Sequence, residues 1–333
     1  MSSSILITGG LGYIGSHTVL NFVQHTQNRI TIVDNCINSD ISTLSKLKNL
    51  SDQEIIFYQA DVTDYSKMVE IISKEEIDSV IHFAAAKSVS GSIQNPAFYY
   101  QNNVIGLMIL LRAMRCCGVK KIIFSSSATV YSSFNNFPVD ENGKLGYSNP
   151  YGQTKLIGED ILFRGHEQSD LIVNILRYFN PLGNESSGHL GDNIYESATN
   201  IMPMILKALH HKKKFFIYGH DYPTKDGSPV RDYIHVCDLA RAHRLSFESL
   251  EESSGYEVMN IGQGFGVSVL ELISTFNAVN DLKIPIEYKE RRDGDLSVCY
   301  ADTNKIKKQL GWEPQYNLSD MCRDAYCFYK NTA

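Results

Sequence analysis

The feature that most constrains the fold is a glycine-rich turn near the N-terminus, Gly9-Gly10-Leu11-Gly12-Tyr13-Ile14-Gly15. It follows a short apolar run over 4–8 and precedes an amphipathic stretch near 14–27. Glycines in this pattern let the backbone approach a pyrophosphate, and a helix that begins there directs its N-terminal N–H groups at the anion. The turn therefore predicts a strand–turn–helix unit that binds a dinucleotide, with a ligand-free tight turn as the alternative.

Asp34 supports a bound dinucleotide over a ligand-free turn and indicates which dinucleotide it is. It ends the second predicted strand, about 20 residues after Gly15, where a carboxylate binds the adenosine ribose hydroxyls. A negative charge at this place repels a 2′-phosphate, and no arginine stands beside it in the sequence. The sequence therefore predicts NAD, and not NADP, as the cofactor.

Short apolar runs alternate with longer amphipathic stretches over the first 180 residues. This rhythm is typical of parallel strands joined by crossover helices, and it predicts an α/β fold with a doubly wound, Rossmann-like sheet. The predicted strands are 4–8, 30–33, 55–59, 79–83, 121–125 and 171–176, and the predicted helices lie near 14–27, 64–74, 96–117 and 150–166. Asn149-Pro150 marks the start of the last helix, since a capping residue precedes a proline at the first helical position.

The rhythm breaks after Asn180, where 181–232 is rich in Gly, Asn, Pro and aromatic residues, with one apolar helix near 201–209. Regular patterning returns over 231–246 and 257–261, and a helix is expected near 268–279. We expect an NAD-binding domain over 1–180, to which 231–262 returns. A smaller C-terminal α/β domain, over 181–230 and 263–333, would bind the substrate.

Composition limits the function classes. The net charge of −6 gives no basic excess of the kind that binds nucleic acid. The histidines show no zinc-ligand spacing, so no metal site is expected. The 7 cysteines are scattered without a Cys-x-x-Cys pair, which favours a reducing compartment.

No membrane segment or signal peptide is expected either. The N-terminus lacks basic residues, and the longest apolar run, 104–111, is far too short to span a bilayer. We interpret that run as a buried helix. The chain is therefore expected to be a soluble, cytoplasmic protein.

Tyr151 and Lys155 form the strongest candidate catalytic pair. Their spacing places both side chains on one face of a helix. Tyr326 and Lys330 share that spacing, but a core-facing tyrosine is the simpler interpretation there. The 151–155 pair follows the serine-tipped strand near 121–127, whose C-terminal end is expected close to a bound nicotinamide.

Tyr151 also lies in the first turn of its helix, where the helix dipole favours a phenolate. The ammonium of Lys155 and a positive nicotinamide would lower the pKa of Tyr151 further, toward that of a general base. The sequence therefore predicts redox chemistry on an alcohol, with Tyr151 as the base.

Several segments carry a resemblance to a known family: 8–17 (TGGLGYIGSH), 125–131 (SSSATVY), 150–155 (PYGQTK), 177–180 (RYFN), 230–235 (VRDYIH) and 291–295 (RRDGD). They resemble the extended short-chain dehydrogenase/reductase family and, within it, the UDP-glucose 4-epimerases. The match runs over nearly the whole chain, in order and at compatible spacing.

The resemblance implies a role for each matching residue. Tyr151 would be the catalytic base, Lys155 would contact the nicotinamide ribose, and Ser127 would bind the sugar 4-hydroxyl. The expected cofactor-binding residues are Gly9, Gly12, Tyr13, Ile14 and Gly15 at the pyrophosphate, Asp34, Asn35 and Ser39 around the adenosine ribose, Asp61 and Val62 at the adenine, and Phe83, Ala84, Lys87, Asn102 and Phe179 along the rest, with Ser127, Tyr151 and Lys155. The expected nucleotide-sugar residues are Asn180, Asn200, Tyr218, Arg231, Arg292 and Asp295, besides Ser127 and Tyr151.

The implied activity is that of an isomerase in galactose metabolism, an epimerase that interconverts UDP-glucose and UDP-galactose. Tyr151 would remove the 4-hydroxyl proton while the C4 hydride passes to NAD, and the hydride would return to the other face of a transient 4-keto sugar. NAD is regenerated in each cycle and can stay bound. A homodimer is implied by the family alone.

Cys299 follows Asp295 where family members place either a tyrosine or a small side chain beside the C2 substituent. A small residue there would also admit UDP-N-acetylglucosamine and UDP-N-acetylgalactosamine, and an ordinary buried cysteine is the alternative. The preference between plain and N-acetylated substrates stays open. So does the effect on NAD affinity of Ala85-Ala86, Ser90-Gly91 and Ser132, where this chain departs from the family pattern.

The sequence also bears on three alternative functions. A sugar-nucleotide 4,6-dehydratase needs an acid and a base just before Val130-Tyr131, and this chain has Ala128 and Thr129 there. A UDP-uronic-acid epimerase or decarboxylase is harder to exclude, although no extra basic cluster suits a C6 carboxylate. A non-catalytic NAD-bound regulator is disfavoured because both Tyr151 and Lys155 are retained.

Overall fold

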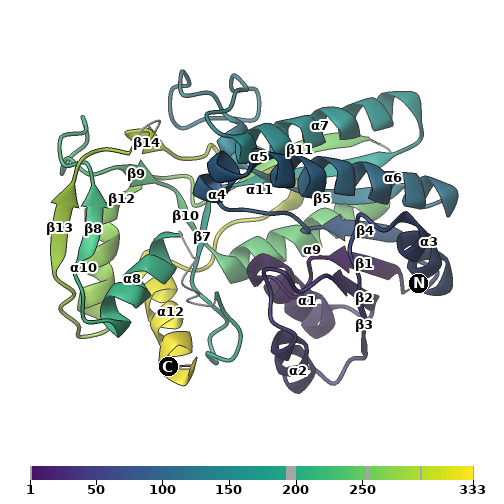
Figure 1. Ribbon diagram of the computed structural model, residues 1–333, viewed down its shortest axis with the longest axis horizontal. Helices are drawn as coiled ribbons and strands as arrows, with labels where there is room; N and C mark the ends of the chain where they lie inside the picture. Colours follow the sequence, from purple (N-terminus) through teal and green to yellow (C-terminus); the bar gives the residue numbers. More distant parts are fainter. Residues whose placement is uncertain (1, 193–199, 253–254, 293–294, 333) are drawn as a thin grey trace. The chain divides into compact units, whose positions relative to one another are not determined.

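The computed structural model describes residues 2–192, 200–252, 255–292 and 295–332. The chain divides into two compact units (Figure 1). Unit 1 comprises Met1–Ser132, Leu145–Arg177 and Ala240–Met259, and unit 2 comprises Ser133–Lys144, Tyr178–Leu239 and Asn260–Ala333. The expected domains are 1–180 with 231–262, and 181–230 with 263–333. They would assign 133–144, 178–180, 231–239 and 260–262 to the first domain instead, and as functional domains they stay a prediction.

Unit 1 is built on a seven-stranded sheet with the strand order β11-β6-β5-β4-β1-β2-β3. The strands are β1 (Ser4–Thr8), β2 (Arg29–Asp34), β3 (Ile55–Gln59), β4 (Ser79–His82), β5 (Lys121–Ser127), β6 (Ile172–Tyr178) and β11 (Tyr256–Ile261). The pairings from β5 through β4, β1 and β2 to β3 are parallel. The strand order reverses between β1 and β4, which is the place where doubly wound folds bind their ligands. The predicted fold class is confirmed.

Helices cover both faces of this sheet. They are α1 (Tyr13–His25), α2 (Ser42–Asn49), α3 (Tyr65–Lys74), α4 (Val89–Gln94), α5 (Pro96–Tyr99), the π-helix η1 (Tyr100–Ile105), α6 (Gly106–Cys116), the 3-10 turn η2 (Ala128–Val130), α7 (Pro150–Gln168) and α9 (Val236–Glu252). Figure 1 shows α3, α6 and α7 on one face, and α1, α2 and α9 on the other. Met68, Leu110 and Leu162 bury the apolar sides of α3, α6 and α7 against β-strand residues such as Leu6.

In unit 1 several elements differ from the sequence expectation. Helices α2 and α4 were not predicted, because their sequences are short, at 8 and 6 residues, and largely polar. The expected helix over 96–117 is interrupted by the π-helix η1. The apolar run 104–111 is only half buried, since Leu107 and Leu110 are covered whereas Ile105 and Met108 are 45% and 50% exposed.

Unit 2 contains three small sheets, β7–β10, β12–β9–β14 and β8–β13. The strands are β7 (Asn180–Leu182), β8 (Phe215–Tyr218), β9 (Val230–Arg231), β10 (Tyr233–His235), β12 (Val267–Ser268), β13 (Ile286–Lys289) and β14 (Val298–Cys299). The helices are α8 (Ile201–His210), α10 (Val269–Val279), α11 (Asn304–Leu310) and α12 (Leu318–Thr332). Ile205, Phe276 and Met321 place α8, α10 and α12 around a common apolar core. Within the described ranges, no helix has both the length and the apolar content that a membrane crossing requires.

Candidate active site

The glycine turn leaves room for a pyrophosphate at the start of α1. Gly9 has a φ of +72°, and a Cβ on Gly15 would lie 2.2 Å from the Gly9 carbonyl oxygen. Gly12 caps α1 without any side-chain hydrogen bond, so the first N–H groups of the helix are available to an anion. Tyr13 and Ile14 begin the helix at this point. The turn fits the diphosphate of a dinucleotide.

Asp34 lies at the C-terminal end of β2, beside the same turn. Its carboxylate accepts hydrogen bonds from the Leu11 N–H at 3.0 Å, the Cys36 N–H at 2.9 Å and the Ser39 hydroxyl at 2.8 Å. The carboxylate is therefore oriented by the glycine turn and by the loop that follows β2. This position suits the ribose hydroxyls of a dinucleotide whose phosphates lie at the turn.

The expected adenine-side residues gather next to Asp34. The Asn35 amide donates to Asp61 at 2.8 Å, and Thr63 donates to the other oxygen of Asp61 through its N–H and hydroxyl. Burial acts to raise the pKa of Asp61, but these hydrogen bonds together lower it. Asp61 is thus a fixed carboxylate, and Val62 beside it is buried.

Ser127 and Tyr151 come together where β5 and α7 meet. Ser127 ends β5, and its hydroxyl oxygen accepts from the Thr129 hydroxyl at 3.1 Å. Asn149 caps α7 by accepting from the Gly152 N–H at 2.9 Å, as predicted. A Cβ on Gly152 would lie 2.8 Å from the Thr129 carbonyl oxygen, so only glycine permits this approach of α7 to the end of β5.

The pKa of Tyr151 differs from the sequence expectation. Burial raises it to about 12, although a hydrogen bond with Ser127 acts in the opposite direction. The lowering expected from the helix dipole and Lys155 is not found in the chain alone, where burial of the phenol has the largest effect on the pKa. A phenolate therefore depends on charge that a bound cofactor brings.

Lys155 lies one helical turn after Tyr151. Its Nζ donates to the Ser125 carbonyl oxygen at 2.7 Å and lies 5.9 Å from the centroid of the Tyr151 ring. Burial lowers the pKa of Lys155 to about 7, against the opposing effect of Glu159. A lysine with this pKa gains or loses its charge near neutral pH, so a nearby ligand can set its protonation state.

A buried polar network behind this pair was not predicted. Arg177 donates to both oxygens of Glu159, at 2.6 Å to Oε2 and 3.0 Å to Oε1, and to the Tyr131 hydroxyl at 3.1 Å. Ser126 also donates to Glu159, at 2.5 Å. The network joins β5, β6 and α7. Arg177 belongs to the 177–180 segment that the sequence analysis singled out. Its partner Glu159 lies 18 residues earlier in the chain, so no local pattern indicated the pair.

Asn103 is a second residue that sequence reasoning missed. It is buried in η1, accepts from the Ala86 N–H at 2.8 Å and donates to the Ala86 carbonyl oxygen and to the Thr154 hydroxyl, each at 3.0 Å. The π-helix places Asn102 next to it, and the Asn102 amide donates to Asn103. Unusual helical turns of this kind occur often at functional sites.

The remaining expected cofactor residues are distributed over both units. Phe83 and Ala84 follow β4, and Ala84 lies against Gly9, whose added Cβ would be 2.7 Å from the Ala84 nitrogen. The Nζ of Lys87 lies 5.9 Å from the centroid of the Tyr13 ring. Phe179 belongs to unit 2, where it is buried.

All six expected nucleotide-sugar residues line one cavity of about 230 Å³ in unit 2. Apolar residues of β8 and α8, among them Phe215, Phe216 and Met204, complete its wall. The six residues are Asn180, Asn200, Tyr218, Arg231, Arg292 and Asp295. Positions that are far apart in the sequence therefore meet at one site of suitable chemistry for a nucleotide diphosphate.

Within the cavity, Arg231 forms an ion pair with Asp295, and the Cζ of Arg292 lies 3.9 Å from the centroid of the Tyr218 ring. Cys299 does not line this cavity, but it pairs with Arg231 in the β9–β14 register. Burial raises the pKa of the Cys299 thiol to about 11, so it remains a small, neutral side chain. Asp293 and Gly294 of the 291–295 segment lie outside the described residues.

Asp232, between Arg231 and β10, is a further residue that sequence reasoning missed. Its buried carboxylate accepts from the backbone N–H groups of Gln263, Gly264 and Ala301, at 2.6–3.1 Å. Burial raises the pKa of Asp232 to about 6 despite these bonds. Asp232 thereby fixes the backbone that carries Arg231.

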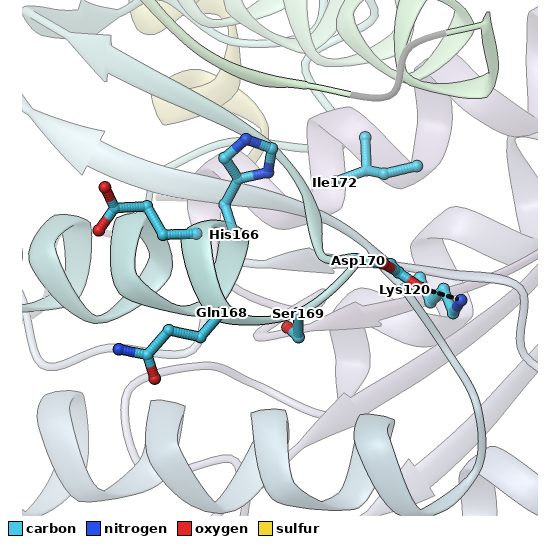
Figure 2. Close-up of a pocket in the computed structure, with 7 residues that line it drawn as sticks. Lys120, His166, Gln168, Ser169, Asp170 and Ile172 are labelled. Atoms are coloured by element: carbon cyan, nitrogen blue, oxygen red, sulfur yellow. Dashed lines mark hydrogen bonds and ion pairs between the residues drawn. The ribbon is translucent and has the colours of Figure 1, made fainter.

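A separate hollow lies at the C-terminal end of α7 in unit 1 (Figure 2). Figure 2 shows Lys120 and Asp170 joined as an ion pair, with His166 on the preceding helix. The lining residues are Lys120, His166, Glu167, Gln168, Ser169, Asp170 and Ile172. None of them is an expected site residue. In the part of the chain that the structure describes, no three His, Cys, Asp or Glu side chains are grouped so as to hold a metal ion.

The chain is similar to known proteins both in sequence and in structure. Residues 6–325 match the family model described as GDP-mannose 4,6 dehydratase. The chain is 42% identical to UDP-glucose 4-epimerase from Bacillus subtilis (strain 168) over 97% of this chain and 96% of that protein. The structure of UDP-glucose 4-epimerase from Bifidobacterium longum in complex with NAD+ and UDP superposes with a TM-score of 0.93, at 37% identity over 99% of this chain and 98% of that one. The UDP-Glc/GlcNAc 4-epimerase from Campylobacter jejuni gives a TM-score of 0.87, at 35% identity over 99% of this chain and 100% of that one.

Proposed function

This chain belongs to the family described as GDP-mannose 4,6 dehydratase and, within it, to the UDP-glucose 4-epimerases, and we propose that its residues interconvert UDP-glucose and UDP-galactose as follows. Two observations support this proposal. Ser127, Tyr151 and Lys155 lie together at the end of β5, and a separate cavity holds two arginines and an aspartate. NAD, when bound, supplies the acceptor for the C4 hydride and afterwards its donor.

The residues of unit 1 handle the proton of the 4-hydroxyl. Ser127 hydrogen-bonds the sugar oxygen, and the phenolate oxygen of Tyr151 takes the proton as C4 is oxidised to a ketone. Tyr151 returns that proton to the oxygen when C4 is reduced from its other face. Lys155 holds the nicotinamide ribose, and its charge favours the phenolate of Tyr151.

The residues of unit 2 hold the nucleotide. Arg231 and Arg292 bind the diphosphate and Asp295 the ribose diol, while Asn180, Asn200 and Tyr218 contact the rest of the nucleotide sugar. Inversion at C4 requires a firm grip on the nucleotide and a weak grip on the hexose, because the keto sugar must turn over. The concentration of charged residues in this cavity suits that requirement.

The family model carries the name of a dehydratase, but the residues after Ser127 do not support dehydration. Removal of water across C5 and C6 needs an acid and a base. Ala128 cannot supply either, and the Thr129 hydroxyl is bonded to Ser127. Both residues lie in η2, where a dehydratase would need its acid–base pair.

The test is turnover of UDP-galactose by the purified protein without added NAD. We expect UDP-glucose to form, and Tyr151→Phe to lower the rate by roughly 10²–10⁴-fold because the general base is lost. Tyr326→Phe is the matched control: Tyr326 has a lysine at the same spacing, with the Lys330 Nζ 4.9 Å from its ring centroid, and this variant should keep full activity. Equal activity in wild type and Tyr151→Phe would refute the assignment.

We also propose that the chain forms a homodimer. Four apolar side chains of α4, α5, η1 and α6 are exposed in the monomer: Ile93 by 64%, Phe98 by 37%, Ile105 by 45% and Met108 by 50%. Burial of such side chains stabilises association.

All 7 cysteines are free in the structure, which supports the cytoplasm as the compartment.

A further inference from the structure

One of the two arginines in the unit 2 cavity is covered by a carboxylate. Arg231 Nη2 donates to Asp295 Oδ1, and Arg231 Nη1 donates to the Val230 carbonyl oxygen at 2.8 Å. The two side chains of the ion pair are 16% and 29% exposed, so water screens their attraction only in part. Asp295 therefore neutralises a guanidinium that an incoming diphosphate needs.

Arg292 lines the same cavity but is held in a different way. Its Cζ lies 3.9 Å from the centroid of the Tyr218 ring, and the residue is exposed. A guanidinium that stacks on an aromatic face keeps its N–H edge for a planar or tetrahedral anion. The two arginines thus differ, because Arg292 can receive an anion directly whereas Arg231 must first release Asp295.

We propose that Asp295 is a specificity residue that competes with the diphosphate for Arg231 until a ribose diol draws it away. The proposal rests on the function proposed above, in which this cavity binds a UDP-sugar. Ribose hydroxyls donate hydrogen bonds to a carboxylate, so a nucleotide gives Asp295 a new partner as its phosphates take over Arg231. Inorganic pyrophosphate has no such donor, and it must displace Asp295 without giving it a partner.

The exchange has two consequences for binding. The nucleoside and diphosphate parts of the ligand bind cooperatively. The ribose gives Asp295 a new hydrogen-bond partner, which helps the diphosphate to take Arg231, and the diphosphate in turn releases Asp295 to the ribose. Free pyrophosphate and similar anions are rejected, since they leave a partly buried carboxylate unpaired. The cavity therefore selects for a ribonucleoside diphosphate, and not for negative charge alone.

Isothermal titration calorimetry on the NAD-bound protein tests this exchange. The ligands are UDP, 2′-deoxy-UDP and inorganic pyrophosphate, and the proteins are wild type and Asp295→Asn. We expect pyrophosphate to bind the variant about tenfold more tightly, because its competitor is gone. Removal of the 2′-hydroxyl should weaken binding about tenfold in wild type and only about twofold in the variant.

Asp221→Asn is the matched control, because it removes the same charge from unit 2. Asp221 accepts from the exposed Arg291 Nε at 2.8 Å, and neither residue lines the cavity. The affinity of the Asp221→Asn variant for pyrophosphate should stay within about twofold of wild type, since a surface ion pair has little effect on a distant site. Asp295→Ser serves as a second carboxylate-free variant should Asp295→Asn fail to fold.

The outcomes separate this inference from the function on which it rests. Unchanged or weaker pyrophosphate binding in the Asp295 variants, or equal tightening in Asp221→Asn, overturns the exchange. Wild-type protein that neither binds UDP nor converts UDP-galactose refutes the proposed function itself. Wild-type protein that does both, with pyrophosphate affinity independent of Asp295, refutes the exchange alone.

Discussion

Arg177 and Glu159 form a buried ion pair directly behind the candidate catalytic residues, with the Arg177 Nη2 2.6 Å from Glu159 Oε2 and both side chains almost fully covered. Burial acts to lower the pKa of Arg177, but the hydrogen bonds and charge of Glu159 raise it above its usual value. The same carboxylate accepts from Ser126, the neighbour of Ser127. The pair therefore fixes the end of β5, which carries the proposed site residue Ser127.

The first prediction concerns this pair. Glu159→Gln should lower the free energy of unfolding by about 3–5 kcal/mol, because it leaves the Arg177 guanidinium buried without a counter-charge. Urea denaturation at neutral pH measures the change. Arg164→Ala is the control on the same helix: Arg164 pairs with Glu167 at the surface, and its loss should change stability by only a small fraction of that amount. Equal losses in the two variants would contradict the role of the buried pair.

The second prediction concerns the pyrophosphate turn. Gly15→Ala should abolish retention of NAD, because the new methyl would lie 2.2 Å from the Gly9 carbonyl oxygen and would push the turn apart. The absorbance ratio at about 260 and 280 nm of the purified protein reports the bound dinucleotide. Gly118→Ala provides the comparison, since Gly118 has a φ of +78° but nothing within 4 Å of an added Cβ. That variant should lose about 1 kcal/mol of stability and keep its NAD.

The third prediction concerns acid stability. His82 is buried with its Nδ1 2.7 Å from the Thr8 hydroxyl, and burial, aided by the charge of Lys155, lowers its pKa to about 3. The pKa of histidine in the unfolded chain is about 6.5, so between these values the unfolded state binds a proton that the folded state does not. The contribution of His82 to the free energy of unfolding should therefore fall as the pH drops below about 6.5, by about 2 kcal/mol at roughly pH 5.

Urea titrations across this pH range measure the effect. His82→Gln keeps a hydrogen-bonding partner for Thr8 but carries no titratable ring, so its acid slope should be shallower. The same substitution at the exposed His25 should leave the slope as in wild type. A slope in His82→Gln as steep as that of wild type would show that the acid loss comes from other groups.

The fourth prediction concerns the width of the substrate range. Cys299 is a small, neutral residue in register with Arg231, and we propose that its volume admits a C2 acetamido group. Cys299→Tyr should suppress turnover of UDP-N-acetylgalactosamine and spare UDP-galactose, whereas Cys299→Ser should keep both activities. Chromatography of the products after incubation with each substrate measures this ratio. Equal loss of both reactions in Cys299→Tyr would count against the proposed gate.

The local chemistry of the site was readable from the sequence because it depends on neighbours along the chain. A strand, a glycine turn and a helix follow one another over 4–25, and the structure shows Gly9 with a positive φ and Gly15 against the Gly9 carbonyl. The helix start at Asn149-Pro150 is confirmed for the same reason, since a cap needs only the next three residues. Tyr151 and Lys155 share a face through helical geometry alone.

The partners of the site residues and the pKa of Tyr151 depend on contacts between distant residues and on the exclusion of water. Arg231 meets Asp295, and Asn103 meets Ala86, only because separate elements converge, and no local pattern encodes such pairings. The pKa of Tyr151 followed burial, and not the neighbouring charges that the sequence displays, because desolvation is a property of the packed chain. The sequence therefore determined which groups are present and how each is presented locally, whereas packing determined their partners and their charge.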